Sequence, residues 1–268
     1  MAKNDPNASI EKAAVILLPS YLIKSQKFSD MTPIAAALRT VRARIDAAAR
    51  AVGRDPASIL LLAVSKTCST LDVRAALDAG QHAFGENYAN ELAEKAASLA
   101  GLGLEWHFIG SLQGNKTRIV AECCDWVHGI DRLKIAERLS MQRDANRLPL
   151  QVCLQVNVSG ELSKSGVPPG EVISLAHAVA ALPRLCLRGL MCIPEPSEDP
   201  SLLRHRFALL RQMGEQLRSE GLHLDTLSMG MSHDLETAIA EGATIVRVGT
   251  AIFGEREKAG TTGELVSQ

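Results

Sequence analysis

The feature that most constrains the fold of this chain is a series of short apolar runs, which begins at residue 59 and recurs along the rest of the sequence. The first run covers residues 59–65 and shows no alternation of apolar with polar residues, so a strand with one solvated face is excluded. A continuous run of this length is typical of a strand buried on both faces of a parallel sheet. Because parallel strands need a long crossover connection, the segments between the runs are expected to form helices.

Eight strands and seven intervening helices are expected on this basis. The strands are expected at residues 59–65, 82–85, 105–109, 125–130, 150–158, 185–193, 224–229 and 244–253. The helices between them are expected at residues 71–79, 89–99, 116–124, 133–146, 169–182, 201–220 and 233–241. Eight such units in 268 residues predict an α/β fold that consists of a single (β/α)8 TIM barrel, with a doubly wound open sheet as the alternative.

A further helix is expected before the first strand, over residues 33–52. Thr32 suits the N-cap position, Pro33 suits the first helical position, and Gly53 is a typical residue just after a helix end. Residues 1–30 show no clear period and are interpreted as a loosely attached extension, so that residues 31–268 form the barrel domain. The longest apolar piece of the extension is too short to span a membrane, and no signal peptide is predicted.

Charge and cysteine content exclude several classes of protein. The chain carries 29 Lys and Arg against 30 Asp and Glu, and this balance argues against a nucleic-acid surface or a polybasic membrane patch. Its six cysteines include no C-x-x-C pair, and they show neither metal-ligand spacing nor a disulfide framework. We therefore expect a cytoplasmic protein in a reducing compartment, without a metal site.

The first apolar run ends in Ser65-Lys66-Thr67, which places a lysine at the mouth of a buried strand. Desolvation at such a position would lower the pKa of the Lys66 amine and favour the neutral form, which is the form that makes a Schiff base. The alternative is a strand-end lysine that extends its ammonium group into water. In a barrel the functional site lies at the carboxyl ends of the strands, and this position favours a functional Lys66.

Hydroxyl groups next to glycines lie near the carboxyl ends of the last two expected strands. Ser232 ends the stretch Gly230-Met231-Ser232, just ahead of the helix expected from residue 233, and Thr250 follows Gly249. Backbone N–H groups at a helix start bind phosphate, and phosphate sites in barrels recur after strands seven and eight. The alternative for Ser232 is a plain N-cap, and the acidic first turn of the helix would weaken anion binding.

Arg247 is a charged residue inside the last apolar run, and a buried charge needs a partner. That partner is either a ring nitrogen of a ligand or an internal carboxylate, so structural pairing is the alternative to ligand binding. The adjacent residues Ser232, His233 and Asp234 have the residue types of a catalytic triad, but sequence neighbours cannot form its geometry. No catalytic residue is therefore predicted.

Several longer motifs resemble those of one known family. They are LLAVSKT at 61–67, FGENY at 84–88, EWHFIGSLQGNK at 105–116, KSG at 164–166, RGLMCIP at 188–194, GMSHDLETAI at 230–239 and VRVGTAIFGER at 246–256. In this order they are similar to the YggS/PROSC family of pyridoxal phosphate homeostasis proteins, which is related to the N-terminal barrel of alanine racemase. The resemblance covers the chain from about residue 33 to residue 256.

The resemblance implies a site for pyridoxal 5′-phosphate (PLP) in which the residues have three roles. Lys66 forms the internal aldimine, Arg247 faces the pyridine nitrogen, and Asn87 lies near the hydroxyl side of the ring. The phosphate group is held by Ser232, Gly249, Thr250 and the backbone around Met231.

The implied function is intracellular PLP homeostasis, in which a monomer holds the cofactor and passes it to PLP-dependent apoenzymes. Few residues follow the last expected strand, too few for the second domain through which alanine racemase supplies an opposing tyrosine base. The tyrosines of the chain are Tyr21 and Tyr88. The alternative is an enzyme, either a single-domain PLP-dependent racemase-like enzyme or a lysine Schiff-base aldolase.

Overall fold

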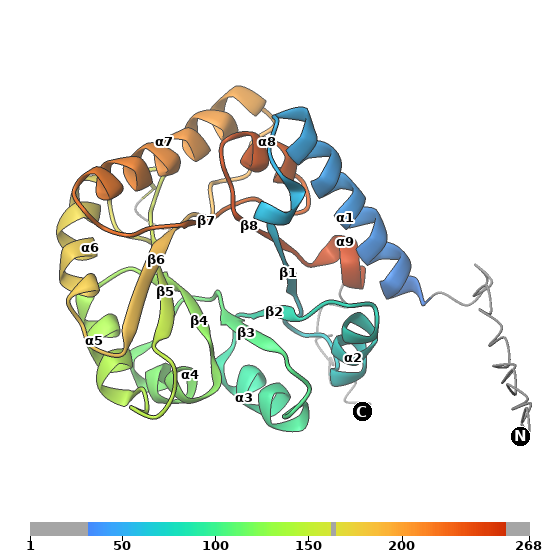
Figure 1. Ribbon diagram of the computed structural model, residues 1–268, viewed down its shortest axis with the longest axis horizontal. Helices are drawn as coiled ribbons and strands as arrows, with labels where there is room; N and C mark the ends of the chain where they lie inside the picture. Colours follow the sequence, from blue (N-terminus) through green and yellow to red (C-terminus); the bar gives the residue numbers. More distant parts are fainter. Residues whose placement is uncertain (1–31, 162–164, 256–268) are drawn as a thin grey trace, which may run out of the picture. The chain divides into compact units, whose positions relative to one another are not determined.

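The computed structural model describes residues 32–161 and 165–255, and its strands close into a parallel barrel with the order β1 to β8 (Figure 1). The strands are β1 (Leu60–Val64), β2 (Ala83–Glu86), β3 (Glu105–Phe108), β4 (Trp126–Ile130), β5 (Leu150–Gln155), β6 (Leu185–Met191), β7 (Thr226–Ser228) and β8 (Ile245–Val248). β1 pairs with both β2 and β8, which closes the sheet. The predicted (β/α)8 barrel is confirmed, and the open doubly wound sheet is wrong.

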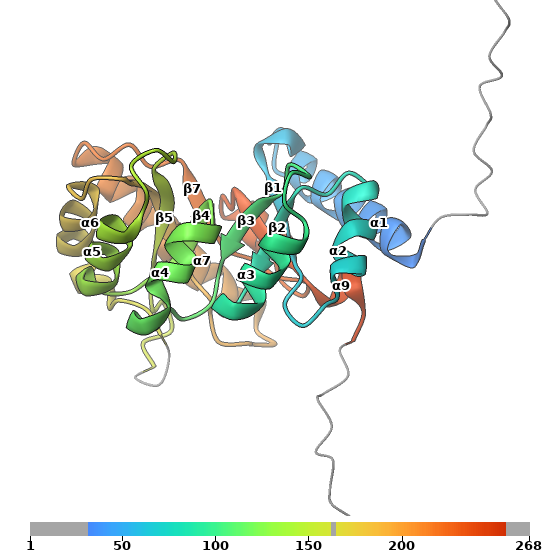
Figure 2. The ribbon, with the colours of Figure 1, turned by 90° about the horizontal axis from the view of Figure 1, so that it is seen from below.

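Helices surround the barrel, as crossover connections between parallel strands require (Figure 1). They are α1 (Pro33–Ala51), α2 (Thr70–Asp78), α3 (Ala89–Ser98), α4 (Thr117–Cys123), α5 (Leu133–Gln142), α6 (Val172–Ala180), α7 (Pro200–Ser219), α8 (Leu235–Ala240) and α9 (Thr250–Phe253). Short 3-10 turns are η1 (Pro56–Ser58), η2 (Gly114–Lys116) and η3 (Pro169–Glu171). α3, α4 and α5 lie next to one another on the outside of the barrel (Figure 2).

The helix expected before the first strand is present as α1, and local signals explain where it begins. The Thr32 hydroxyl accepts a hydrogen bond from the Ala35 amide at 3.2 Å, and Pro33 occupies the first helical position. The buried face of the helix consists of Leu38, Val41, Ile45 and Ala49. α1 packs against α2, α8 and α9, so it covers the side of the barrel where β8 meets β1 (Figure 1).

Two expected boundaries near the site are wrong. The sequence predicts a strand over 244–253, but β8 ends at Val248 and the apolar run continues as α9. Amides of α9 donate to the Gly249 carbonyl oxygen, so the chain turns into a helix after Gly249 although its residues remain apolar. The helix expected from residue 233 begins at Leu235. Both errors arise because apolar periodicity does not mark the turn that ends a buried strand.

Some predictions fall outside the part of the chain that the structure describes. Residues 1–30, interpreted as a loosely attached extension, lie outside it, and so does Lys164 of the KSG motif. The division into an extension and a barrel domain therefore stays a prediction. Among the helices of the described residues, none has the length and apolar character needed to cross a membrane.

The interior of the barrel combines apolar and polar side chains. Along β8, Val246 and Val248 pack into the outer core, and Arg247 alternates with them and faces the other side of the sheet. The apolar residues of the interior are Leu62, Val64, Ala83, Ile109 and Ile245, with Trp126, Cys153 and Met191 as a second group. Its polar residues include His107, His128, Ser228 and Arg247, and all four are buried.

We expect Gly189→Ala to disrupt the pairing of β6 with β7. Gly189 lies opposite Thr226, and a Cβ atom added to Gly189 would lie 1.8 Å from the Thr226 carbonyl oxygen. Because this neighbour is backbone, the strands must separate, and the free energy of unfolding should fall by about 3 kcal/mol. Urea denaturation measures the loss. Gly170→Ala is the control, since its added Cβ would meet no atom within 4 Å. Equal stability of the two variants would contradict the register of β6 and β7.

Candidate functional site

A cavity of about 230 Å³ opens at the carboxyl ends of the strands. Its lining includes every site residue predicted from the sequence, namely Lys66, Asn87, Met231, Ser232, Arg247, Gly249 and Thr250. The rest of the wall is formed by Val64, Ile109, Ile193 and His233. Residues that follow β1, β2, β7 and β8 thus meet in one place, because the carboxyl ends of all eight strands lie on the same side of the barrel.

The turn that carries Lys66 connects β1 to α2. Lys66 is half-buried, and it follows Ser65, which is fully buried. Thr67 has a φ of 64°, a left-handed conformation that costs energy for a β-branched residue. α2 then begins with a capping box, in which Ser69 and Asp72 exchange hydrogen bonds. The lysine therefore sits on a short, strained turn between two well-defined elements.

A buried ion cluster, which consists of Lys95, Glu86 and Glu91, holds this turn on both sides of Lys66. The Lys95 ammonium donates to Glu86 Oε1 at 2.8 Å and to Glu91 Oε1 at 2.7 Å. It also donates to the Ser65 carbonyl oxygen at 2.7 Å. On the other side of the lysine, the Thr67 amide donates to the Glu91 carboxylate. The backbone before and after Lys66 is thereby fixed to α3 and to the end of β2.

Glu86 is the most buried member of the ion cluster. Its Oε1 accepts hydrogen bonds from Lys95 and from the Ser65 hydroxyl, whereas Oε2 has no partner among the described residues. Burial raises the pKa of Glu86, and the hydrogen bonds from Lys95 and Ser65 oppose this rise. We did not predict these residues from the sequence. The available signals were the i,i+4 spacing of Glu91 and Lys95 and a carboxylate at the end of a buried strand.

The loop that carries Ser232 is closed by the acidic residues that follow it. The Asp234 carboxylate accepts the Met231 amide, and Asp234 is the residue that precedes α8, so the N-cap alternative for Ser232 is wrong. Glu236 pairs with Arg44 of α1 at 2.8 Å, and Arg44 also donates to the Ser232 carbonyl oxygen at 3.0 Å. Burial raises the pKa of Asp234. Both carboxylates are thus engaged, which reduces their effect on anion binding.

Arg247 lies in the wall of the cavity and is buried, with 4% of its surface exposed. Its Nη1 donates to Ser228 Oγ at 2.7 Å, and its Nη2 donates to the Cys192 carbonyl oxygen at 2.8 Å. No carboxylate in residues 32–161 and 165–255 forms an ion pair with it, so the internal carboxylate expected as one alternative is wrong. Burial lowers the pKa of Arg247, but guanidinium groups stay protonated in proteins. The site therefore contains a buried cation with hydrogen-bond donors to spare.

A metal centre is not part of the described structure. The residues 32–161 and 165–255 contain no group of three or more His, Cys, Asp and Glu side chains that could hold a metal ion. The polar groups of the cavity are an amine, hydroxyl groups, an amide and a guanidinium. Such a set suits an anionic ligand with a reactive carbonyl better than a cation.

The chain is similar to proteins of known family over most of its length. The family described as alanine racemase, N-terminal domain, matches residues 37–257. The pyridoxal phosphate homeostasis protein of Pseudomonas aeruginosa is 58% identical over 227 residues, which are 85% of this chain and 97% of that protein. The pyridoxal phosphate homeostasis protein of Escherichia coli is 52% identical over 233 residues, which are 85% of this chain and 98% of that protein.

Solved structures show the same fold. PipY of Synechococcus elongatus with PLP bound has a TM-score of 0.73 and 36% identity, and the match covers 82% of this chain and all of PipY. Alanine racemase of Corynebacterium glutamicum has a TM-score of 0.63 at 19% identity, and the match covers 63% of that chain. The second likeness concerns the fold alone.

We expect Lys95→Met to destabilise the protein by about 3–5 kcal/mol, because it leaves two carboxylates of the ion cluster without their cation. The loss should depend on pH. Without Lys95 the pKa of Glu86 rises further, and a carboxyl with a raised folded pKa stabilises the fold only at low pH, while it is protonated. The loss should therefore be smaller at pH 5 than at pH 8.

Urea denaturation of wild type and variant at both pH values measures this difference. Lys134→Met is the control, because Lys134 is exposed on α5 and should change stability little at either pH. An equal loss for Lys95→Met at pH 5 and pH 8 would contradict the coupling of Lys95 to Glu86.

Proposed function

The chain belongs to the family of pyridoxal phosphate homeostasis proteins, and on this premise we propose that it binds PLP in the cavity beside Lys66 and takes part in PLP homeostasis. The observation that carries the proposal is that all seven residues nominated by the sequence line this one cavity. PipY, whose structure contains PLP, supports the choice of ligand, since this chain matches the whole of it.

The residues of the cavity fit the groups of PLP. Lys66 supplies the amine that attacks the aldehyde carbon and, with loss of water, becomes covalently attached. Ser232 and Thr250 offer hydroxyl donors, and backbone amides at the starts of α8 and α9 have no acceptor within their own helices. Asn87 Oδ1 is buried without a partner among the described residues, so a hydroxyl on the ligand ring would satisfy it.

Arg247 would affect how strongly the bound cofactor acts as an electron sink. PLP acts as an electron sink in catalysis, and it does so most strongly when its ring nitrogen is protonated. Arg247 can donate a hydrogen bond to the ring nitrogen but does not give up a proton, so the ring would stay unprotonated. This arrangement makes the cofactor a weaker electron sink, which suits a carrier but does not by itself exclude catalysis.

A second observation supports a carrier over a racemase-like enzyme. Tyr88 is the only tyrosine among the described residues, and it is 58% exposed. It lines a neighbouring cavity with Lys116, and it is not part of the wall around Lys66. We therefore propose a cytoplasmic monomer that releases PLP to apoenzymes. Turnover of an amino acid by the purified protein would favour the racemase-like or aldolase alternative instead.

We expect Lys66→Ala to abolish covalent binding of PLP while the fold persists. The purified wild type, mixed with PLP, should show a visible absorbance band, and borohydride should fix the added mass on Lys66. The variant should lose both signals and keep its melting temperature, because a half-buried side chain at a strand end adds little packing. Lys116→Ala, which changes a lysine of the neighbouring cavity, should behave as wild type. Borohydride labelling of another lysine in the Lys66→Ala variant would refute the assignment.

We expect Ser232→Ala to weaken PLP binding by roughly ten- to a hundredfold, since a hydrogen bond to a charged group contributes about 1.5–3 kcal/mol. Pyridoxal lacks the phosphate, so its affinity should change far less. The measurement is a titration of each ligand into wild type and variant. Ser219→Ala, at the exposed end of α7, is the control. Equal weakening for both ligands would show that Ser232 does not contact the phosphate.

A further inference from the structure

Four hydrogen bonds cross the interior of the barrel from Arg247 to Glu105. Arg247 Nη1 lies 2.7 Å from Ser228 Oγ, which lies 2.8 Å from His128 Nδ1. His128 Nε2 lies 3.0 Å from His107 Nδ1, and His107 Nε2 lies 2.6 Å from Glu105 Oε1. We propose that these five residues, which we name the relay, form a hydrogen-bond chain with a single direction that positions Arg247 and stabilises its buried charge.

The two ends of the relay fix its direction. Arg247 can only donate, so the Ser228 hydroxyl accepts from it and donates its own proton to His128 Nδ1. His128 then carries its proton on Nε2 and donates to His107 Nδ1. His107 in turn donates from Nε2 to the Glu105 carboxylate, which can only accept. With both histidines neutral, every donor and acceptor along the relay is matched.

The reverse tautomers would leave a group unmatched. If His128 donated from Nδ1, Ser228 Oγ would accept from both His128 and Arg247. The hydroxyl proton of Ser228 would then have no acceptor among the described residues, in a side chain with no exposed surface. An unpaired buried donor costs about 1–3 kcal/mol, so the direction from Arg247 to Glu105 is favoured.

The surroundings of the relay hold its two histidines in place and keep His128 neutral. His107 and His128 are fully buried, and Trp126 stacks on His107 with a ring-centroid distance of 5.4 Å. Burial lowers the pKa of His128 well below its usual value, and the positive charge of Arg247 adds to this. The other cation nearby, Arg188, lies over the Trp126 ring at 5.0 Å and pairs with Asp225.

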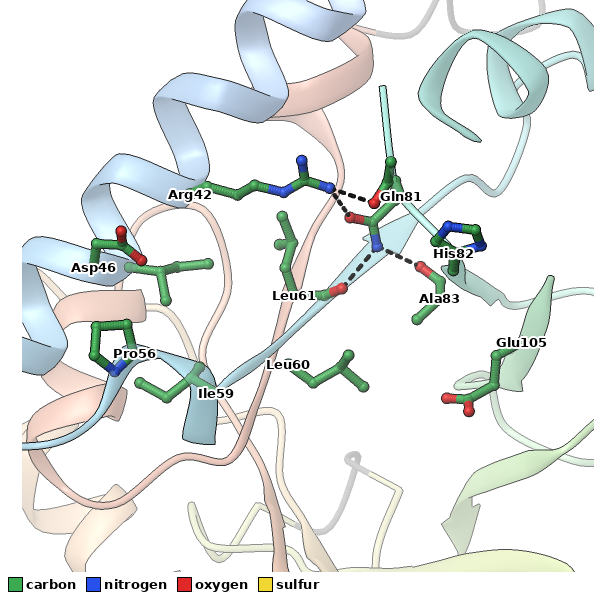
Figure 3. Close-up of a pocket in the computed structure, with 12 residues that line it drawn as sticks. Arg42, Asp46, Pro56, Ile59, Leu60, Leu61, Gln81, His82, Ala83 and Glu105 are labelled. Atoms are coloured by element: carbon green, nitrogen blue, oxygen red, sulfur yellow. Dashed lines mark hydrogen bonds between the residues drawn. The ribbon is translucent and has the colours of Figure 1, made fainter. Parts of the chain in front are cut away.

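The acidic end of the relay reaches solvent at the opposite end of the barrel. Glu105 is the first residue of β3, and its side chain is 46% exposed. It lines a cavity of about 400 Å³ beside α1, and Asp46 lies on the other side of the same cavity (Figure 3). The hydrogen bond from His107 lowers the pKa of Glu105, so the terminal acceptor is a carboxylate at neutral pH.

Arg247 forms no ion pair among the described residues, and Asp234 is the carboxylate whose charge acts on it directly. The relay adds a second carboxylate, Glu105, at the far end of a chain of hydrogen bonds. Each neutral member is polarised by the charges at the two ends, and such polarised chains strengthen their own hydrogen bonds. Glu105, His107, His128 and Ser228 are positioning residues, since the cavity wall includes Arg247 but none of them. The effect of these residues on PLP binding rests on the proposed function. The positions of the protons on His107 and His128 do not depend on it.

The first test measures the tautomers directly. In the full chain labelled with ¹⁵N-histidine, long-range ¹H–¹⁵N spectra should show His107 and His128 neutral and protonated on Nε2 at pH 7. His177, which pairs with Glu220 on the surface at 3.0 Å, is an internal reference outside the relay. A proton on Nδ1 of His128, or a charged His128, would overturn the proposed direction.

The second test asks whether the two ends are coupled. Glu105→Gln keeps an acceptor but removes the charge, so the ring-nitrogen shifts of His128 should change while those of His177 stay fixed. Asp46→Asn is the matched control, because it removes one charge from the same cavity without touching the relay. His128 shifts that respond equally to both variants, or to neither, would overturn the coupling.

The third test concerns the ligand. Ser228→Ala removes one of the two acceptors of Arg247 and should weaken PLP binding by roughly three- to tenfold, with a smaller effect from Glu105→Gln and none from Asp46→Asn. Affinity in Ser228→Ala equal to wild type would overturn the positioning role. If wild type itself binds no PLP, the proposed function fails, and the tautomers still decide whether the relay exists.

Discussion

The pairing of β1 with β8 is the interaction on which the site depends. It places Leu62 opposite Arg247, so the turn after β1 and the turn after β8 lie side by side although the chain between them makes a full circuit. Lys66 and Thr250 meet in one cavity for this reason alone. An open sheet with the same strands would leave β1 and β8 on separate edges, and no amine would lie near the hydroxyl groups after β7 and β8.

The second constraint is that the buried cations Lys95 and Arg247 need hydrogen-bond acceptors. The barrel supplies such acceptors on both sides of the cavity. Lys95 is surrounded by two carboxylates and a backbone carbonyl, and Arg247 is supported by a hydroxyl and a carbonyl with a relay behind the hydroxyl. A buried ion is tolerated only when its hydrogen bonds are satisfied. The hydrogen bonds of Lys95 fix the backbone around Lys66, and those of Arg247 fix its own side chain. A ligand would therefore meet a preformed site.

The sequence predicted a strand or helix correctly wherever its apolar residues follow one regular pattern. Short strand-like runs located every strand, and Thr32 and Pro33 located the start of α1. Apolar periodicity did not predict the strand end where an apolar segment changes from strand to helix, as it does at Gly249. Apolar content records burial, and buried apolar residues occur both at the end of β8 and in the following α9, for example Val248 and Ile252.

The sequence by itself determined the barrel and the residues that line its functional end, because strand-end side chains of parallel strands must share one rim. Only the tertiary structure decided which buried groups hold those residues in place. Lys95 reaches the Lys66 turn, and Glu105 is linked to Arg247 through two histidines and Ser228. These contacts between elements have no fixed spacing in the chain. Which buried polar groups meet depends on the register of neighbouring strands, and register is a property of the closed sheet.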